Sequence, residues 1–212
     1  MRPYIIINYA QSVNGIMAGP HGEQVRLSNE EDMARVHRLR HEADAVLVGI
    51  GTVINDDPKL TVKEKYVPNP KQPLRVVVDS KGRVPPNSLV LNDTAKTLIF
   101  VSGLWNGKEI PGAEVIVCGS EKVDLEKMLS MLHEKGVKKA LVEGGGTLIW
   151  SLVEQGLFHE LQVFISPQLL PNGPNVRDEM STDRKNLLLR QESCKTIGNG
   201  VLLTYIPIKG NP

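Results

Sequence analysis

Short runs of apolar residues recur along the chain and alternate with segments whose apolar residues have helical spacing. The runs are rich in Val, Ile and Leu at successive positions, which is typical of strands buried on both faces of a parallel sheet. They predict strands at 4–7, 45–50, 74–79, 97–101, 113–117, 140–142, 160–165 and 200–206. Because no helical pattern separates the last of these runs, we expect the sheet to be mixed at one edge.

Three helices are predicted from start signals that precede apolar residues at helical spacing. The sequence Ser28-Asn-Glu-Glu31 has the form of a capping box, in which Ser28 caps the first turn and Glu31 reaches back to it. Asp124 is expected to cap a second helix that ends near Gly136, and a third follows Thr147. This alternation predicts an α/β fold in one domain over 1–212, with a mostly parallel mixed sheet and helices on both faces.

The composition narrows the classes of function that such a fold could serve. The 212 residues are 41% hydrophobic and 23% charged, which is enough apolar material for a folded core. A formal net charge of +1 and 4% aromatic residues argue against a nucleic-acid-binding surface. No apolar stretch reaches the ~20 residues of a membrane span, and the N-terminal run is too short for a signal peptide. We therefore expect a cytoplasmic protein that binds neither nucleic acid nor membranes.

Three predicted loops carry polar residues at the carboxyl ends of strands, where ligands bind in sheets of this kind. They lie at 51–58, 79–83 and 143–147. In the last of them, Gly144, Gly145 and Gly146 let the backbone approach an anion closely. Thr147 then opens a helix whose first free N–H groups point at that anion. This loop is therefore suited to a diphosphate.

The other two loops offer groups for the rest of a dinucleotide. Ser80, Lys81 and Arg83 provide a hydroxyl and two cations, which suit a phosphate monoester such as the 2′-phosphate of NADP. Thr52 and Asp56 could hold ribose or nicotinamide. Each loop taken alone is more often an ordinary turn, but three of them at strand ends favour a bound ligand. The chain lacks the usual Rossmann glycine fingerprint and the P-loop lysine, so neither a standard dehydrogenase nor an ATPase is indicated.

The histidines do not have the spacing of a metal site. His37 and His41 lie one turn apart on a predicted helix, but no third ligand is near them in the sequence. A solvated helix face explains the pair better than zinc does, and no metal is expected.

Several longer motifs, in the same order along the chain, carry a resemblance to a known family. They are Ala10-Gln-Ser-Val-Asn-Gly15, Gly51-Thr-Val-Ile-Asn-Asp-Asp-Pro-Lys-Leu-Thr61, Arg75-Val-Val-Val-Asp-Ser80, Glu143-Gly-Gly-Gly-Thr147 and Ile165-Ser-Pro167. Together they resemble the riboflavin-biosynthesis pyrimidine reductases over about 4–170. The likeness is closest to the stand-alone archaeal and fungal type, and extends to the C-terminal reductase domain of the bacterial deaminase/reductase.

The resemblance implies a dihydrofolate reductase-like fold, a homodimer and NADPH as cofactor. The implied substrate is 2,5-diamino-6-ribosylamino-4(3H)-pyrimidinone 5′-phosphate, which is reduced at ribose C1′ to the ribitylamino product. By motif, the cofactor positions are Thr52, Asp56, Ser80 and Gly144 to Thr147, joined by Ala10 and Arg26. The substrate positions are Gln24, Arg40, Leu60, Lys63 and Glu143.

These residue types suit the implied chemistry. The ribosylamine can open to an imine whose C1′ accepts a hydride, and a carboxylate beside the protonated nitrogen would stabilise its charge. Glu143 is the candidate for this catalytic role, with a capping or hydrogen-bonding role as the alternative. Arg40 as a bidentate fork and Lys63 as a point charge are candidates to bind the 5′-phosphate, with ordinary surface cations as the alternative.

Two positions depart from the family pattern. Asn14 stands where the family usually has Asp, which keeps the turn but not the charge. Pro171-Asn-Gly-Pro174 replaces the usual glycine pair, so the role of that loop stays open.

Two other functions remain possible at this point. One is a reductase of the same fold that acts on the deaminated pyrimidine or on a pteridine such as dihydrofolate. The other is a non-catalytic nucleotide-binding module that has kept the phosphate loops.

Overall fold

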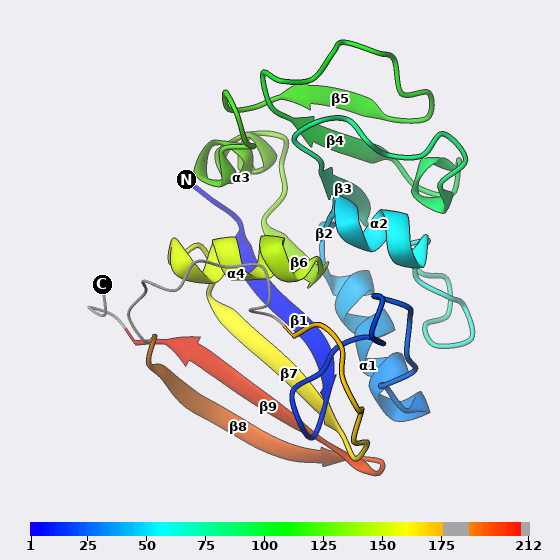
Figure 1. Cartoon of the computed structure of the whole chain (residues 1–212), viewed down its shortest axis with the longest axis vertical. Coiled ribbons are helices and arrows are strands. Elements are labelled where there is room, and N and C mark those ends of the chain that lie inside the picture. Colours follow the sequence, from blue (N-terminus) through cyan, green and yellow to red (C-terminus); the bar gives the residue numbers. More distant parts are fainter. Residues whose placement is uncertain (176–186, 209–212) are drawn as a thin grey trace.

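The computed structural model describes residues 1–175 and 187–208. Within them, nine strands form one sheet in the order β5-β4-β3-β2-β6-β1-β7-β9-β8 (Figure 1). The strands are β1 (Tyr4–Ser12), β2 (Ala45–Gly49), β3 (Leu74–Val78), β4 (Thr97–Val101), β5 (Glu114–Val117), β6 (Lys139–Gly144), β7 (Glu160–Ser166), β8 (Leu189–Ile197) and β9 (Gly200–Pro207). The helices are α1 (Glu30–Glu42), α2 (Ile50–Asp56), α3 (Leu125–Glu134) and α4 (Gly146–Glu154), with a short 3-10 turn η1 (Leu89–Leu91).

The sheet is parallel from β5 to β7 and antiparallel where β9 joins β7 and β8. The predicted mixed edge is therefore confirmed. Strand β8, however, was not predicted. As the outermost strand it leaves most of its side chains exposed, so its sequence lacks the apolar run that marks the others.

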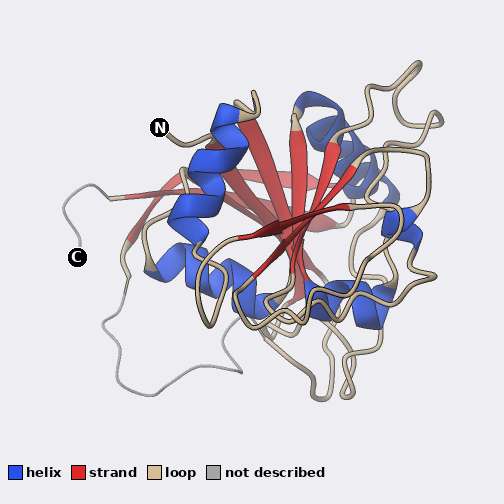
Figure 2. Cartoon of the chain, turned by 90° about the horizontal axis from the view of Figure 1, so that it is seen from above, coloured by secondary structure: helices blue, strands red, loops and turns tan. Residues whose placement is uncertain are grey.

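Helices cover both faces of the sheet, as predicted (Figure 2). Helices α3 and α4 pack on the face that carries Ile5, Leu47 and Phe100. Helix α2 and the end of α1 pack on the opposite face, against residues such as Val46 and Ile99. Both faces of the central strands are therefore dry, which explains their continuous apolar sequences. Within the described residues, no helix has the length and apolarity needed to cross a bilayer.

Two local predictions were wrong. The stretch after β2 forms the short helix α2, although its glycine and its Asn-Asp-Asp-Pro sequence indicated a loop. This helix ends at Asp57, whose φ of 40° is in the left-handed region that Asp tolerates. The cap of α1 is Asn29, whose side chain accepts from the Asp32 amide, while Ser28 instead donates to the Asp32 carboxylate. The predicted cap of α3 by Asp124 is confirmed.

Candidate active site

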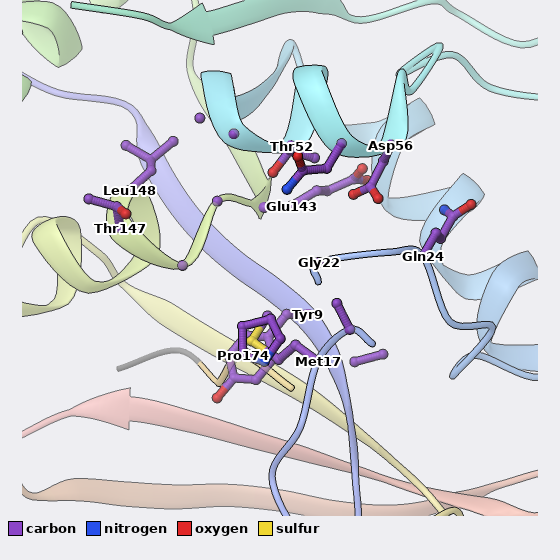
Figure 3. Close-up of a pocket in the computed structure, with 18 of the residues that line it drawn as sticks. Tyr9, Met17, Gly22, Gln24, Thr52, Asp56, Glu143, Thr147, Leu148 and Pro174 are labelled. Atoms are coloured by element: carbon purple, nitrogen blue, oxygen red, sulfur yellow. The ribbon is translucent and has the colours of Figure 1, made fainter. Parts of the chain in front are cut away.

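A cleft of about 1180 Å³ opens where β1, β2, β3 and β6 end. Ligand pockets for one small molecule usually measure about 300–1,000 Å³, so this cleft has room for a dinucleotide and a second ligand. Thr52 and Asp56 project into it from α2, close to Glu143 at the end of β6 (Figure 3). Tyr9 and Met17 lie across the opening from them.

The glycine turn between β6 and α4 needs glycine for steric reasons. Gly145 has φ of 82°, and a Cβ there would lie 3.0 Å from the Gly49 Cα. A Cβ on Gly144 would lie 2.9 Å from the Thr52 hydroxyl oxygen. The turn therefore packs closely on the start of α2, and α4 begins directly behind it. Its first N–H groups lie at the cleft, where an anion can accept hydrogen bonds from them.

Glu143 and Arg40 form a bidentate ion pair inside the protein. Arg40 Nε donates to Glu143 Oε1 and Nη2 to Oε2, both at 2.7 Å, while Nη1 donates to the Thr61 carbonyl at 2.9 Å. The Arg40 side chain is only 16% exposed and the Glu143 side chain only 8%. Burial alone would lower the pKa of Arg40, but the charge and hydrogen bonds of Glu143 outweigh it and raise that pKa. Arg40 thus stands behind Glu143 and does not line the cleft.

The loop after β3 presents Ser80 and Arg83 to the cleft. Its shape depends on the buried Asp79, whose carboxylate accepts from the amides of Arg83 and Val84. Ser80 Oγ accepts from the Val123 amide at 3.2 Å, which joins this loop to the one after β5. Lys122 of that second loop also lines the cleft. The two cations near Ser80 are therefore Arg83 and Lys122, whereas Lys81 does not line the cleft.

The structure brings most of the predicted site residues together. The cleft-lining members of that set are Ala10, Gln24, Arg26, Thr52, Asp56, Lys63, Ser80, Arg83, Glu143, Gly144, Gly145, Gly146 and Thr147. Arg40, Lys81 and the buried Leu60 are not among the lining residues. The lining residues that were not predicted include Tyr9, Met17, Lys122, Ser151, Gln155 and Pro174. Of these, Lys122 had a sequence signal, because it follows a glycine just after a predicted strand.

Two groups near the centre of the cleft titrate away from their ordinary ranges. Burial raises the pKa of Asp56. Burial and the nearby Tyr205 raise the pKa of Tyr9 to about 12, so its hydroxyl stays protonated. Tyr9, Met17 and Pro174 form a largely apolar wall opposite α2, suited to a flat ring (Figure 3).

Asn14 links the turn after β1 to the segment that leads to Pro174. Its amide donates to the Leu170 carbonyl at 2.7 Å and its Oδ1 accepts from the Leu170 amide at 3.2 Å. The Met17 amide donates to the Pro174 carbonyl at 2.9 Å, so the two segments run side by side. An Asp at position 14 could not donate to Leu170. One departure from the family pattern, Asn14, thus bonds the residue directly before the other, Pro171-Asn-Gly-Pro174.

His37 fixes the segment that carries Lys63. Its Nδ1 accepts from the Lys63 amide at 3.2 Å, and its ring stacks on Tyr66 with centroids 4.5 Å apart. Burial lowers the pKa of His37 to about 4, and the positive charges of Arg40, Lys63 and Lys65 add to this effect.

This shift predicts acid sensitivity. As the pH falls below about 6.5, the unfolded chain protonates His37 while the folded chain does not, so the free energy of unfolding falls until about pH 4. Between about pH 7 and 4.5, urea denaturation should show the wild type losing roughly 2 kcal/mol more than His37→Gln. Equal losses of unfolding free energy in the wild type and in His37→Gln would contradict the lowered pKa of His37.

Comparison with known proteins places the chain in a family. Residues 3–203 match the model of the RibD C-terminal domain. The chain is 43% identical to a 2,5-diamino-6-ribosylamino-4(3H)-pyrimidinone 5′-phosphate reductase of Archaeoglobus fulgidus, over 96% of this chain and 98% of that protein. It is 40% identical to the protein of the same name from Methanothermobacter thermautotrophicus, over 99% and 100% of the two chains.

A solved structure shares the fold. The deaminase/reductase of Thermotoga maritima superposes with a TM-score of 0.84 at 24% identity, covering 98% of this chain and 57% of that one. The fold expected from the sequence is thus found in a reductase-containing protein, and the motifs at 51–61, 75–80 and 143–147 surround one cleft. On the family match and the two close relatives, the chain belongs to the RibD C-terminal domain family.

Proposed function

We propose that the protein is an oxidoreductase of riboflavin biosynthesis that uses NADPH to reduce 2,5-diamino-6-ribosylamino-4(3H)-pyrimidinone 5′-phosphate at ribose C1′, giving the ribitylamino product. One observation carries the proposal. A buried carboxylate, Glu143, directly precedes a glycine turn whose backbone amides could receive a phosphate, and both face a cleft with room for two ligands. Its archaeal relatives bear the name of this reductase.

The cofactor would lie along the glycine turn. The backbone of Gly144 to Thr147 and the start of α4 would hold its diphosphate, while Thr52 and Asp56 reach its ribose or nicotinamide. Ser80 and Arg83 would bind the 2′-phosphate, joined by Lys122. Ala10 and Arg26 complete the set of cofactor contacts proposed from the sequence.

The substrate would occupy the rest of the cleft, between α2 and the wall formed by Tyr9, Met17 and Pro174. Gln24 and Lys63 line this part, and Lys63 supplies a positive charge for the 5′-phosphate. The ring oxygen would take up the proton that the reaction consumes as the ribosylamine opens to the protonated imine. NADPH, when bound, would supply the hydride that C1′ of this imine accepts, which gives the amine. The carboxylate of Glu143 stabilises the positive charge of the protonated imine nitrogen. The apolar wall and the burial of Glu143 keep water away and strengthen that interaction.

Turnover measurements separate this proposal from its alternatives. The absorbance of reduced nicotinamide should fall when the protein, NADPH and the ribosylamino-pyrimidine are mixed. Oxidation with only the deaminated pyrimidine or dihydrofolate would assign a different substrate. Tight NADPH binding without turnover on any of the three would indicate a binding module.

Cofactor choice gives a second test, with a matched control in the same loop. Arg83→Ala should raise KM for NADPH about 10-fold or more, because a hydrogen bond to a charged group contributes about 1.5–3 kcal/mol, and should leave KM for NADH unchanged. Lys81→Ala removes a cation two residues away that does not line the cleft, and should change neither value. If Arg83→Ala raised KM for NADPH and for NADH equally, the 2′-phosphate would not bind at this loop.

We also infer a cytoplasmic homodimer. Apolar side chains of β7 and β9 on the α4 side, such as Ile165 and Tyr205, are only half-buried in one chain, which leaves surface for a second copy. Light scattering that gives a mass near that of one 23.4 kDa chain would contradict the dimer.

A further inference from the structure

We propose that Trp105, which does not line the cleft, is a positioning residue that holds Arg83 where it meets the 2′-phosphate of NADPH, and that it thereby strengthens the preference for NADPH over NADH. This inference rests on the proposed function, because it concerns how the same cleft selects its cofactor. It gives a role to the turn after β4, at 102–105, which lies outside the motifs that carry the family resemblance.

The indole ring of Trp105 lies directly against Gly82, the residue before Arg83. A Cβ on Gly82 would stand 2.4 Å from Trp105 Cδ1 and 2.7 Å from Nε1, so only glycine fits beneath the ring. Gly82 also has φ of 67°, in the left-handed region that favours glycine. The loop after β3 can therefore approach the ring closely, and the ring supports that loop from a side that does not face the cleft.

Packing and the backbone of its own turn hold the Trp105 ring in place. The ring packs against the apolar cluster on the α2 side of the sheet. Its Nε1 is buried and has no hydrogen-bond partner within residues 1–175 and 187–208, so packing rather than hydrogen bonding places the ring. The Trp105 amide donates to the Ser102 carbonyl at 3.1 Å, which closes the turn.

The same turn is tied to both loops that bring a cation to the cleft. The amide and Oγ of Ser102 donate to the Ser80 carbonyl at 3.0 and 2.7 Å. The Gly103 amide donates to the Gly119 carbonyl at 3.0 Å, in the loop that carries Lys122. Because β4 lies between β3 and β5 in the sheet, its turn can join the loops that follow both neighbours.

Arg83 depends on this support because its own side chain is held weakly. The Arg83 side chain is 56% exposed, and its Nε lies 3.4 Å from the Asp79 carboxylate. Its direction is therefore set mainly by its backbone, which the Asp79 carboxylate and the Trp105 ring hold from two sides. Arginine binds phosphate well when its fork is presented in the right geometry. Since NADH has a hydroxyl in place of the 2′-phosphate, a displaced Arg83 should weaken NADPH alone.

Nucleotides with and without the 2′-phosphate test this role without turnover. In calorimetric titrations, Trp105→Ala should raise the Kd for 2′,5′-ADP about 3- to 10-fold, which is part of the loss expected when a charged hydrogen bond is removed altogether. The Kd for 5′-ADP should stay unchanged. Trp105→Phe places ring atoms where Cδ1 and Nε1 stand, and should restore most of the affinity. Equal rises of Kd for both nucleotides, or no rise for either, would overturn the proposal.

Gly82→Ala disturbs the same contact from the loop side, and it decides the matter if Trp105→Ala does not fold. Its Cβ would press on the ring, so the variant should show the same selective loss for 2′,5′-ADP. With Trp105→Ala in place the Cβ has room, so Gly82→Ala should cost less affinity there than in the wild type. Fully additive losses would count against the contact. Leu104→Ala, at the exposed neighbour in the same turn, is the matched control and should change neither Kd.

Steady-state kinetics connect the contact to the reaction. Trp105→Ala should raise KM for NADPH while kcat and KM for NADH stay unchanged, and it should add less than about 2-fold to the KM of Arg83→Ala. A wild type that binds 2′,5′-ADP no better than 5′-ADP would overturn this inference and leave the proposed function standing. Failure of the wild type to oxidise NADPH with the ribosylamino-pyrimidine would instead count against the proposed function, while the titrations still decide the role of Trp105.

Discussion

Replacing Glu143 with Gln should lower kcat about 10²- to 10³-fold while the Kd for NADPH changes little, since losing one preorganised electrostatic group typically costs that much. The amide has the size of the carboxylate but not its charge, so the protonated imine loses its stabilising partner. The Arg40 guanidinium would also stay buried without its counter-ion, which adds a loss of stability. Steady-state kinetics with the ribosylamino-pyrimidine, together with fluorescence titration of NADPH, measure both effects.

The chain offers a matched control for this variant. Glu42 and Lys139 form an ion pair at 3.1 Å that joins the same two elements, α1 and β6, at the opposite end of the strand. Both side chains are at least one-third exposed and neither lines the cleft, so Glu42→Gln should leave kcat unchanged and alter stability by less than about 1 kcal/mol. A Glu143→Gln enzyme with wild-type kcat would show that the carboxylate has no electrostatic role in the reaction.

Replacing Gly145 with Ala should abolish measurable NADPH binding and also destabilise the fold. Its φ of 82° costs a side chain about 1–2 kcal/mol, and the new Cβ would press on the Gly49 backbone at 3.0–3.1 Å. Because two stretches of backbone meet there, relief requires the glycine turn to move away from α2. The amides that should receive the diphosphate would move with it.

Gly136→Ala separates the two effects. Gly136 ends α3 with φ of 91°, and a Cβ there would have no neighbour within 4 Å. The Gly136→Ala variant should therefore lose about 1–2 kcal/mol of stability and bind NADPH normally. Urea denaturation and NADPH titration of both variants are the required measurements. Normal NADPH binding by Gly145→Ala would mean that the diphosphate lies elsewhere.

The sequence predicted the interior of the fold better than its margin. Strands such as β2 and β4 are apolar at every position because both faces are covered, and that pattern is local. Strand β8 has no such pattern, because it gains its place only by pairing with β9. The sequence does not predict helix α2 because Asn55-Asp-Asp-Pro58 at its end resembles a turn, and its seven residues are too few for clear periodicity.

The same holds for the candidate site, where the sequence predicts what is local and misses what depends on tertiary packing. Residues that closely follow strand ends, such as Thr52 on α2 and Ser80 in the loop after β3, could be found because topology sends every parallel strand end to one edge. The partner of Arg40 could not be found, because the pairing with Glu143 depends on how α1 lies against β6. For the same reason the sequence favoured Lys81 over Lys122, whose loop meets the Ser80 loop only through the order of β3, β4 and β5.

The position of β1 at the centre of the sheet has a consequence for how the chain acquires its structure. Ile6 pairs with Leu141 on one side and with Glu160 on the other, so β1 finds both neighbours only after β6 and β7 have been made. Strands β2 to β5 can associate earlier, since each lies beside the next. Such long loop closures slow folding. The nascent protein must therefore shield an exposed, apolar first strand until β6 and β7 emerge to enclose it.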